Sequence, residues 1–583
     1  MVSYLDLSVT RKNAVRVVTE KGKLHCATRC KSNNESLPTD SRASIYQKTV
    51  WSHDFIVGLE SNFSMNCKEK VEKLEEKVTT MLNDYENGGS SILQLLELVD
   101  DIERLGLGYR FQTNITSILN KVASTNEIKE EDNLHAVSLK FRLLRQHDYS
   151  VSQGVFKRFK DSNGGFIGCL QTDVKAVLSL YEASYLAFES ELDLHEAKLF
   201  TTENMLKLSG DVNQEMADHI SHALDVPLYR RMHRLEARWY IGAYSKRKDA
   251  NKFLLDLAIL DFNMVQSVHK RDLQKVSKWW EDLGLASKLS FTRDRVMECF
   301  FGSVGVVFEP QYYSCRVGLT KACALINTID DIFDIYGSVD ELKVFTNAVK
   351  RWDINEVEHM PEYLKLGFLA LYNTINEMGY ESLITQGKSI IPTLARVWGE
   401  FSEAMYVEAK WNQTNYMPTL EDYLDNAWRS SSAVVILTHV YVSMNQDVKT
   451  DSLGKCHDLL KWSSMICRLH NDLATSSDEM DRGKNANAIS CYMQENGVCE
   501  EVARGYINTL IDKAWSKMIE ARIGCSKHLA CPFVDSIINL ARVVHCTCQY
   551  GDGLGAPDAR AKDRILSVII DPISVKDKDQ YSG

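Results

Sequence analysis

Apolar residues recur at helical spacing along most of this chain, and the alternating pattern typical of strands is scarce. Ile92–Leu98 and Asp173–Leu180 show the pattern in the first half, and residues 318–336, 390–410 and 456–480 show it in the second. Short polar breaks separate these segments. The pattern predicts an all-α fold in which each segment buries one face against other helices.

The predicted helix 318–336 combines an apolar surface with three carboxylates, Asp330, Asp331 and Asp334. Asp330 and Asp334 are four residues apart and share one face, whereas Asp331 is turned about 100° away. Gly337 is expected to end this helix. Unpaired carboxylates are costly to bury, and oxygen ligands on a rigid helix suit Mg²⁺ that also binds phosphate oxygens. The segment predicts a Mg²⁺-diphosphate site, the alternative being helix-end residues that face water.

A second set of polar residues lies in the predicted helix 456–480. Asn471, Thr475 and Glu479 follow at intervals of four, which places three oxygen ligands along one helix face. Arg468 precedes them by about one turn. Thr475 could instead donate back to a main-chain carbonyl, and the last residues could be a solvated helix end. We favour a second Mg²⁺ site here.

Arg293-Asp294-Arg295 precedes the aspartates along the chain. Two guanidinium groups near a Mg²⁺ site could hold a diphosphate through planar pairs of hydrogen bonds. By spacing alone, a pair of surface arginines is the simpler interpretation.

Composition limits the remaining possibilities. At 583 residues the chain exceeds the size at which one core usually divides, so we expect two domains, 39–260 and 261–583. The net charge of −11, without a basic stripe, argues against a nucleic-acid partner. No apolar run is long enough to predict a transmembrane segment. The 15 cysteines lack metal-binding spacing, and we expect them to be small buried side chains in a reducing compartment and not a disulfide framework.

Residues 1–38 differ from the rest of the chain. Through Glu35 there are seven Lys or Arg residues against few acids, mainly Asp6 and Glu20, with hydroxyl residues interspersed. This composition is typical of a plastid or mitochondrial transit peptide, and it lacks the apolar core of a secretory signal. The alternative is a disordered N-terminal tail.

Taken together, these motifs resemble those of plant class I terpene synthases, and the monoterpene synthase subfamily most. The resemblance covers nearly the whole chain after residue 38. It rests on the aspartate-rich motif Asp330-Asp331-x-x-Asp334, the second metal motif Asn471-Asp472-Leu473-x-Thr475-x-x-x-Glu479, the upstream Arg293-x-Arg295, and the phrases Glu309-Pro310-Gln311 and Glu408-Ala409-Lys410-Trp411.

The resemblance implies an N-terminal α-barrel domain beside a C-terminal class I helical bundle that ionises a prenyl diphosphate. It implies a cluster of three Mg²⁺ ions, or Mn²⁺, with the catalytic motif Asp330, Asp331 and Asp334 on one wall. The implied metal ligands are Asp330, Asp334, Asn471, Thr475 and Glu479, and the implied diphosphate-binding residues are Arg293, Arg295, Asp330, Asp334, Arg468 and Asn471.

The chemistry also implies further features of the enzyme. The carbocation must be protected from water, and aromatic faces can stabilise it, for which Phe333, Tyr336 and Tyr550 are candidates. We expect the chain in the plastid stroma, as a monomer with a homodimer as the alternative.

The chain departs from the family pattern at four places. The tandem arginine that precedes the tryptophan by nine residues reads Ser41-Arg42 before Trp51, and Phe-Phe-Trp reads Phe300-Phe301-Gly302. A lysine after the second metal motif is Asn487, with Lys484 nearby, and a Ser-Gly helix break is Ser432-Ala433.

The changes at Ser41 and Gly302 weaken substrate isomerisation and stabilisation of the cation. We therefore expect acyclic products from geranyl diphosphate, such as linalool, geraniol, myrcene or ocimene. The alternatives are a sesquiterpene synthase acting on farnesyl diphosphate to a nerolidol-type product, a cyclic monoterpene synthase, a chain-elongating prenyltransferase, and a decayed homologue that binds diphosphate without turnover.

Overall fold

The structure, a computed structural model, describes residues 46–61, 65–124, 133–167, 173–208, 210, 212–444, 453–481, 486–525 and 531–574. For a few helical residues, Glu479 among them, it describes the main chain only. β structure within the described residues is limited to one bridge between Lys160 and Phe166. The predicted all-α fold is confirmed. The expected transit segment 1–38 lies outside the described residues, as does Lys484.

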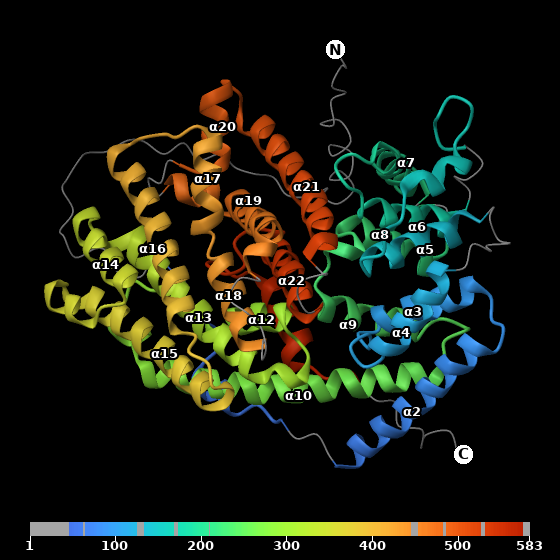
Figure 1. Cartoon of the computed structure of the whole chain (residues 1–583), viewed down its shortest axis with the longest axis horizontal. Helices are drawn as coiled ribbons and strands as arrows, with labels where there is room; N and C mark the ends of the chain where they lie inside the picture. The colour runs from blue at the N-terminus through green and yellow to red at the C-terminus, as the bar shows by residue number, and fades with distance from the viewer. Residues whose placement is uncertain are drawn as a thin grey trace, which may run out of the picture.

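Helices from the first half of the chain gather at one end of the molecule, on the right of Figure 1. They are α2 (Met65–Asn87), α3 (Ile92–Arg104), α4 (Gln112–Ser124), α5 (Leu134–Gln146), α6 (Val174–Ser184), α7 (Leu192–Leu208), α8 (Gln214–Asp225) and α9 (His233–Tyr244), with the 3₁₀ turns η1 (Gln153–Phe159) and η3 (Leu228–Arg230).

Helices from the second half form the larger body on the left of Figure 1. They are α11 (Leu285–Lys288), α12 (Val296–Val306), α13 (Tyr313–Asp331), α14 (Val339–Arg351), α15 (Glu362–Gln386), α16 (Ile391–Thr414), α17 (Leu420–Ser430), α18 (Ala433–Met444), α19 (His457–Asp481), α20 (Ala488–Asn496), α21 (Glu500–Cys525), α22 (Cys531–Cys548) and α23 (Ala559–Ile565). Short turns are η4 (Pro310–Tyr312), η5 (Ile332–Tyr336), η6 (Ile354–His359), η8 (Gly454–Cys456) and η9 (Leu566–Ile570).

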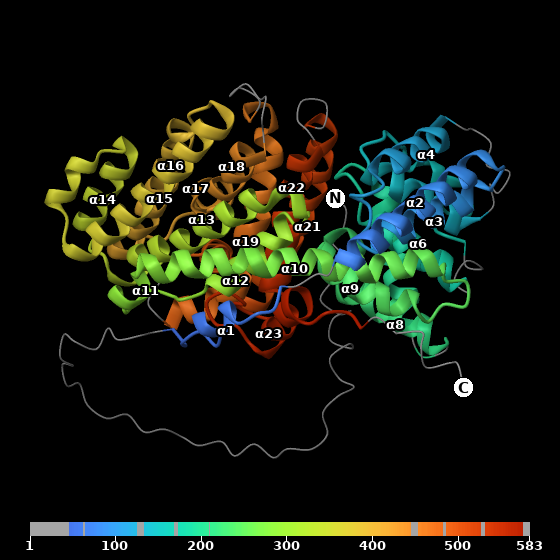
Figure 2. The same ribbon diagram turned by 90° about the horizontal axis from the view of Figure 1, so that it is seen from below.

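Helix α10 (Lys252–Leu283) runs along both halves of the molecule (Figures 1 and 2). Its first turn is capped by the side chain of Asn251, and it ends at Gly284, whose φ of 68° is a left-handed conformation that glycine adopts without strain. The domain boundary expected after residue 260 falls inside this helix. The chain therefore passes from one half to the other without an irregular linker at that point.

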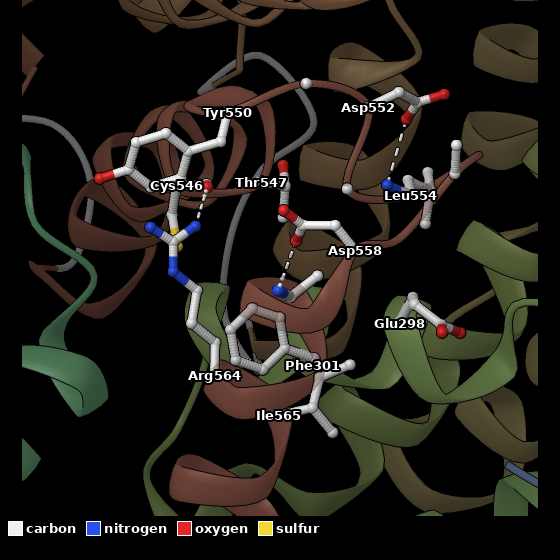
Figure 3. Close-up of a pocket in the computed structure, with 14 residues that line it drawn as sticks. Glu298, Phe301, Cys546, Thr547, Tyr550, Asp552, Leu554, Asp558, Arg564 and Ile565 are labelled. Carbon is white, nitrogen blue, oxygen red and sulfur yellow. Dashed lines mark hydrogen bonds between the residues drawn. The ribbon is translucent and has the colours of Figure 1, made fainter. Parts of the chain in front are cut away.

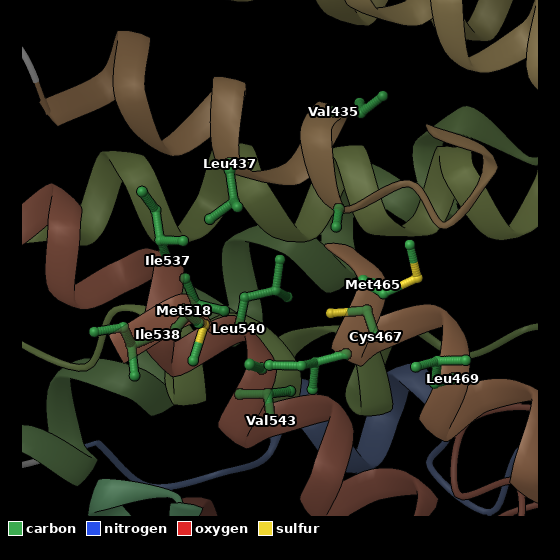
Figure 4. Packing of buried hydrophobic residues seen from close by; sticks show 14 of the residues in the cluster. Val435, Leu437, Met465, Cys467, Leu469, Met518, Ile537, Ile538, Leu540 and Val543 are labelled. Atoms are coloured by element: carbon green, nitrogen blue, oxygen red, sulfur yellow. The ribbon is translucent and has the colours of Figure 1, made fainter. Parts of the chain in front are cut away.

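Part of the largest apolar cluster lies between α18, α19, α21 and α22 (Figure 4). Leu437 of α18, Leu469 of α19, Met518 of α21 and Ile537 of α22 are among its buried side chains. Burying apolar surface contributes about 25 cal/mol per Å², so such close packing holds these four helices in a fixed arrangement. Helix α19, which carries the second set of predicted ligands, therefore has a rigid support.

The first described residues and the C-terminal helix pack together beneath α12. Trp51 and Ile56, which belongs to α1 (His53–Val57), share an apolar cluster with Phe301 of α12 and Ile565 of α23. Figure 2 shows α1 and α23 side by side below α12. Segments from the two ends of the chain thus meet close to the residues that follow Arg295.

The expectation that the cysteines carry no disulfide is wrong at one pair. Cys456 at the end of η8 is bonded to Cys525 at the end of α21. Their Cα atoms are 5.4 Å apart, within the range that a disulfide requires, although 69 residues separate them in the sequence. Sequence spacing carried no signal for this pair, because the packing of α19 against α21 brings the two residues together.

Candidate functional site

Asp330 and Asp334 both line one cavity of about 230 Å³. Asp330 lies in the last turn of α13, and Asp334 lies in η5, a single π-helical turn. Such wide turns are rare and are frequent at functional sites. Gly337 ends the segment as predicted and donates to the Ile332 carbonyl at 2.9 Å, but with a φ of −75° it does not form a left-handed cap.

Asp331 does not line the cavity, although it lies between Asp330 and Asp334 in the sequence and both of these do. Its side chain is fully buried. Its carboxylate accepts from the main-chain N–H of Arg293 at 2.7 Å and pairs with Nε of Arg293 at 3.0 Å. Burial raises the pKa of Asp331 to about 6, and the Arg293 charge opposes that rise. Asp331 therefore holds Arg293 in place.

Arg293 completes this wall. It lines the cavity, and its guanidinium donates to Asp330 as well as pairing with Asp331. The ring of Tyr46 lies 5.1 Å from the guanidinium carbon of Arg293 and lines the same cavity. Because its two carboxylate contacts fix the guanidinium from one side, its cavity-facing side can approach an anion.

Arg468, Asn471 and Thr475 of α19 line the cavity from another side. The Thr475 hydroxyl donates to the Asn471 carbonyl at 3.0 Å, the local bond anticipated from the sequence. That bond uses the hydroxyl hydrogen and leaves an oxygen lone pair able to accept a cation. The two predicted ligand walls, far apart in the sequence, thus share one cavity.

Contacts with neighbouring helices hold Arg468. It donates to the Ser430 hydroxyl at 2.9 Å and the Ala427 carbonyl at 3.3 Å. The carboxylates of Glu408 and Asp472 lie 3.9 and 3.7 Å from its terminal nitrogens. Glu408 belongs to the Glu-Ala-Lys-Trp phrase of the sequence and also lines the cavity.

The side chain of Glu479 lies outside the described residues, so the third predicted ligand of α19 is not located. Among the described residues, no group of three His, Cys, Asp or Glu side chains could by itself hold a metal ion. The possible metal ligands that face the cavity include the carboxylates of Asp330 and Asp334, the amide oxygen of Asn471 and the hydroxyl oxygen of Thr475. Their oxygen chemistry suits Mg²⁺, which binds few protein ligands and completes its shell with water and phosphate.

Arg295 is not brought together with the other predicted diphosphate ligands. It is 2% exposed and is not among the residues that line the cavity. Its guanidinium donates to main-chain carbonyls of Leu554, Gly555 and Gln47. Motif spacing could not distinguish the two arginines, because the difference arises from segments elsewhere in the sequence.

None of the three aromatic residues that were predicted to stabilise the cation lines the cavity, so that prediction is wrong. Phe333 packs in the core, with its ring centroid 5.9 Å from that of Phe345. Tyr336 stacks on Phe291 at 4.5 Å, and Tyr550 is 46% exposed. The aromatic residues that do line the cavity are Tyr46, Phe401 and Tyr423. Phe401 lies within the predicted helix 390–410, but helical periodicity alone marks it only as a buried position.

Of the four departures from the family pattern, those at Gly302, Ser432-Ala433 and Asn487 lie at described residues, and the structure shows their surroundings. Ser432 takes a φ of 62° between α17 and α18 and lines the cavity with Ala433, so the predicted helix break is present. Asn487 caps α20 by accepting from the Ser490 N–H at 2.9 Å. A Cβ added to Gly302 would lie 3.7 Å from Val543, an ordinary contact distance. Gly302 itself is not among the lining residues.

Apolar side chains form another part of the cavity lining. Ile326, Met405, Ile436, Leu540 and Val544 contribute from four helices and adjoin the polar residues described above. A cavity that combines two cationic side chains and acidic groups with an apolar part suits an amphiphile with an anionic head and a hydrocarbon tail.

Comparisons with known proteins give family matches in both halves of the chain. Residues 50–224 match the model of the terpene synthase N-terminal domain, and residues 281–517 match that of the terpene synthase family metal-binding domain. The chain is 63% identical over 577 residues to the chloroplastic (E)-beta-ocimene synthase of Matricaria chamomilla var. recutita, with 96% of each chain covered. It is 45% identical to the chloroplastic tricyclene synthase TPS4 of Medicago truncatula, with 94% of each covered.

A solved structure resembles the whole fold. The isoprene synthase of grey poplar (Populus x canescens), in complex with three Mg²⁺ ions and dimethylallyl-S-thiolodiphosphate, superposes with a TM-score of 0.82 and 46% identity. The match covers 90% of this chain and 99% of that chain. No described helix is both long and apolar enough to cross a membrane. With both family domains present and close relatives along nearly its whole length, the chain belongs to the terpene synthase family and is an enzyme of that family.

Proposed function

We propose that this terpene synthase ionises geranyl diphosphate with the help of Mg²⁺ or Mn²⁺, releases diphosphate, and forms an acyclic monoterpene. The observation that carries the proposal is the shared cavity. Asp330 and Asp334 face it from α13 and η5, Arg468, Asn471 and Thr475 face it from α19, and apolar side chains of α13, α16, α18 and α22 also line it.

The metal ligands follow from the donor chemistry. We assign Asp330 and Asp334 to one side of a three-ion cluster, and Asn471, Thr475 and Glu479 to the other. Support comes from the oxygen donors on both sides of the cavity and from the three Mg²⁺ ions named for the grey poplar enzyme. When bound, the ions would stabilise the negative charge that develops on the leaving diphosphate.

The protein side chains contribute binding and protection. Arg293, fixed by Asp331, and Arg468, fixed by Ser430, can each donate to diphosphate oxygens as the allylic C–O bond breaks. The apolar lining excludes water from the allylic cation. Phe401 and Tyr423 line the cavity, and aromatic rings can stabilise positive charge without reacting with it.

The acyclic product is supported by two separate observations. The sequence lacks the tandem arginine, reading Ser41 at that position, and has Gly302 in place of an indole side chain. Ser41 lies outside the described residues. A relative that is 63% identical is named an ocimene synthase. Farnesyl diphosphate with a nerolidol-type product is the second candidate; the sequence feature that favours it is Gly302, which does not itself line the cavity.

Incubation of the purified chain with geranyl or farnesyl diphosphate and Mg²⁺, followed by mass-spectrometric identification of products, tests the proposal. We expect ocimene, myrcene, linalool or geraniol from geranyl diphosphate, and little conversion of farnesyl diphosphate. Predominantly cyclic products would overturn the acyclic assignment, and preferential use of farnesyl diphosphate would overturn the substrate.

We further propose that the chain acts as a monomer in the plastid stroma after removal of a transit peptide. The basic, hydroxyl-rich composition of residues 1–38 supports import, as do the chloroplastic relatives. Import of a fluorescent fusion of residues 1–60 into isolated chloroplasts would test the location, and light scattering would test the oligomeric state.

A further inference from the structure

Arg295 is a buried cation whose contacts are with the main chain. Its Nε donates to the Leu554 carbonyl at 3.0 Å, and one terminal nitrogen donates to the Gly555 carbonyl at 3.1 Å and the Gln47 carbonyl at 2.8 Å. The other terminal nitrogen donates to the Asp294 carbonyl at 2.8 Å. A buried guanidinium is costly unless its donors are satisfied, and here carbonyl oxygens from three segments satisfy them.

One of these segments is the loop 551–556, which follows α22. The Asp552 carboxylate accepts from the main-chain N–H of Leu554 at 3.1 Å and of Gly555 at 2.7 Å, so the loop folds around it (Figure 3). A Cβ at Gly555 would collide with this carboxylate. Asp552 and Leu554 both line the catalytic cavity.

The loop is incompletely packed on the side that faces α12 and α23. A cavity of about 60 Å³ separates it from α12 and α23, with Phe301 and Ile565 among the lining residues (Figure 3). Because a void provides no van der Waals contacts, polar bonds have to hold the loop against the catalytic cavity. Arg295 supplies two of them.

The second segment begins at Tyr46. The Gln47 carbonyl accepts from Arg295, while Tyr46 lines the catalytic cavity beside Arg293. Trp51 is buried in the apolar cluster that also contains Phe301 of α12. Arg295 is therefore the point at which two cavity-lining segments, from opposite ends of the chain, are joined.

We propose that Arg295 is a positioning residue that fastens the loop 551–556 and the segment Tyr46–Trp51 over the catalytic cavity and thereby limits the access of water to the carbocation. The inference rests on the proposed ionisation of geranyl diphosphate. The carbocation can react in two ways. Loss of a proton from carbon gives a hydrocarbon, whereas attack by water forms a C–O bond and, after the water loses a proton, gives an alcohol. When the loop and the segment are held less firmly, water reaches the cation more readily and formation of the alcohol is favoured.

The test compares Arg295→Gln and Arg295→Lys with the control Arg564→Gln. Arg564 also donates to a main-chain carbonyl, that of Cys546, but it holds neither segment. We expect Arg295→Gln to raise the ratio of alcohol to hydrocarbon about threefold to tenfold, with the alcohol oxygen derived from ¹⁸O-labelled water. Arg295→Lys, which can replace only part of the hydrogen bonding, should lie between Arg295→Gln and the unaltered chain. The control should leave the ratio unchanged.

A second readout does not depend on turnover. Hydrogen–deuterium exchange of the peptide containing residues 551–556 should be faster in Arg295→Gln than in both the unaltered chain and Arg564→Gln. An unchanged exchange rate together with an unchanged product ratio would overturn the proposal. So would a constant product ratio with inorganic diphosphate inhibition weakened about tenfold or more, since that result would make Arg295 a diphosphate ligand. If the unaltered chain forms no product from geranyl diphosphate, the proposed function fails, while the exchange experiment still tests the fastening of the loop.

Discussion

Adjacent aspartates of the same motif lie in opposite environments. The Asp330 side chain is 34% exposed and lines the cavity, whereas the Asp331 side chain is 0% exposed and contacts Arg293. Successive helical side chains point about 100° apart, so one can bind a ligand while its neighbour packs against the wall. The two residues should therefore respond differently to substitution.

Replacing Asp330 by alanine should abolish turnover, with a loss of about a thousandfold or more in kcat, because a metal ligand of the leaving group is removed. Circular dichroism should show unchanged helical content, since the side chain is partly exposed. Asp340→Ala, which alters a carboxylate in the first turn of α14, is the matched control and should keep full activity. Retained activity in Asp330→Ala would remove this residue from the catalytic assignment.

Asp331→Asn preserves the shape of the side chain and removes its charge. Arg293 would then be less firmly oriented, and we expect kcat/KM to fall by about tenfold to a hundredfold, less than for Asp330→Ala. Weaker inhibition by inorganic diphosphate should accompany this loss, because Arg293 binds that group. A variant that matches Asp330→Ala in residual activity, with unchanged inhibition, would instead make Asp331 a direct catalytic group.

At the scale of elements, helix packing fixes the position of the site. Arg316 of α13 is fully buried and donates to Asp272 of α10 at 2.7 Å and to the Glu309 carbonyl at 2.8 Å. This pair joins the helix that ends in Asp330 to the helix that spans both halves. The positions of the ligands thus depend on contacts made several turns away.

Asp101 of α3 provides a pH-dependent test of packing in the first half. It accepts from the Tyr240 hydroxyl at 2.6 Å and from Arg247 at 2.8 Å, and burial raises its pKa from 3.8 to about 6. Since the folded state binds this proton more tightly than the unfolded state, the contribution of Asp101 to stability falls as the pH rises from about 4 to about 6, by at most about 3 kcal/mol. Asp101→Asn should lose that part of the pH dependence of Tm. Parallel Tm profiles for both proteins would contradict the assigned pKa.

Helical periodicity was sufficient to predict the elements that carry the site. The predicted segments 390–410 and 456–480 correspond to α16 and α19 within a few residues, and 318–336 contains the end of α13. The π-helical turn at Ile332–Tyr336 was not predictable, because apolar residues surround that segment and its periodicity does not separate α from π geometry. The role of Arg295 and the aromatic lining depended on residues distant in the sequence, so local patterns contained no signal for them.

At the scale of the whole molecule, the cavity combines the first described residues with the second half of the chain. Tyr46 is one of the first described residues, and the other lining residues lie between Arg293 and Leu554. Helix α10 and the apolar clusters hold these segments together. Ionisation and protection of the cation are therefore properties of the assembled fold, and no single helix supplies both.

The most direct test of the central claim is a crystal structure of this chain with Mg²⁺ and a thiolodiphosphate analogue of geranyl diphosphate. We predict that the diphosphate lies between the two walls, with metal ions bound to Asp330 and Asp334 on one side and to Asn471, Thr475 and Glu479 on the other. Its oxygens should also contact Arg293 and Arg468. A diphosphate bound outside this cavity, or metal ions held by only one wall, would contradict the account.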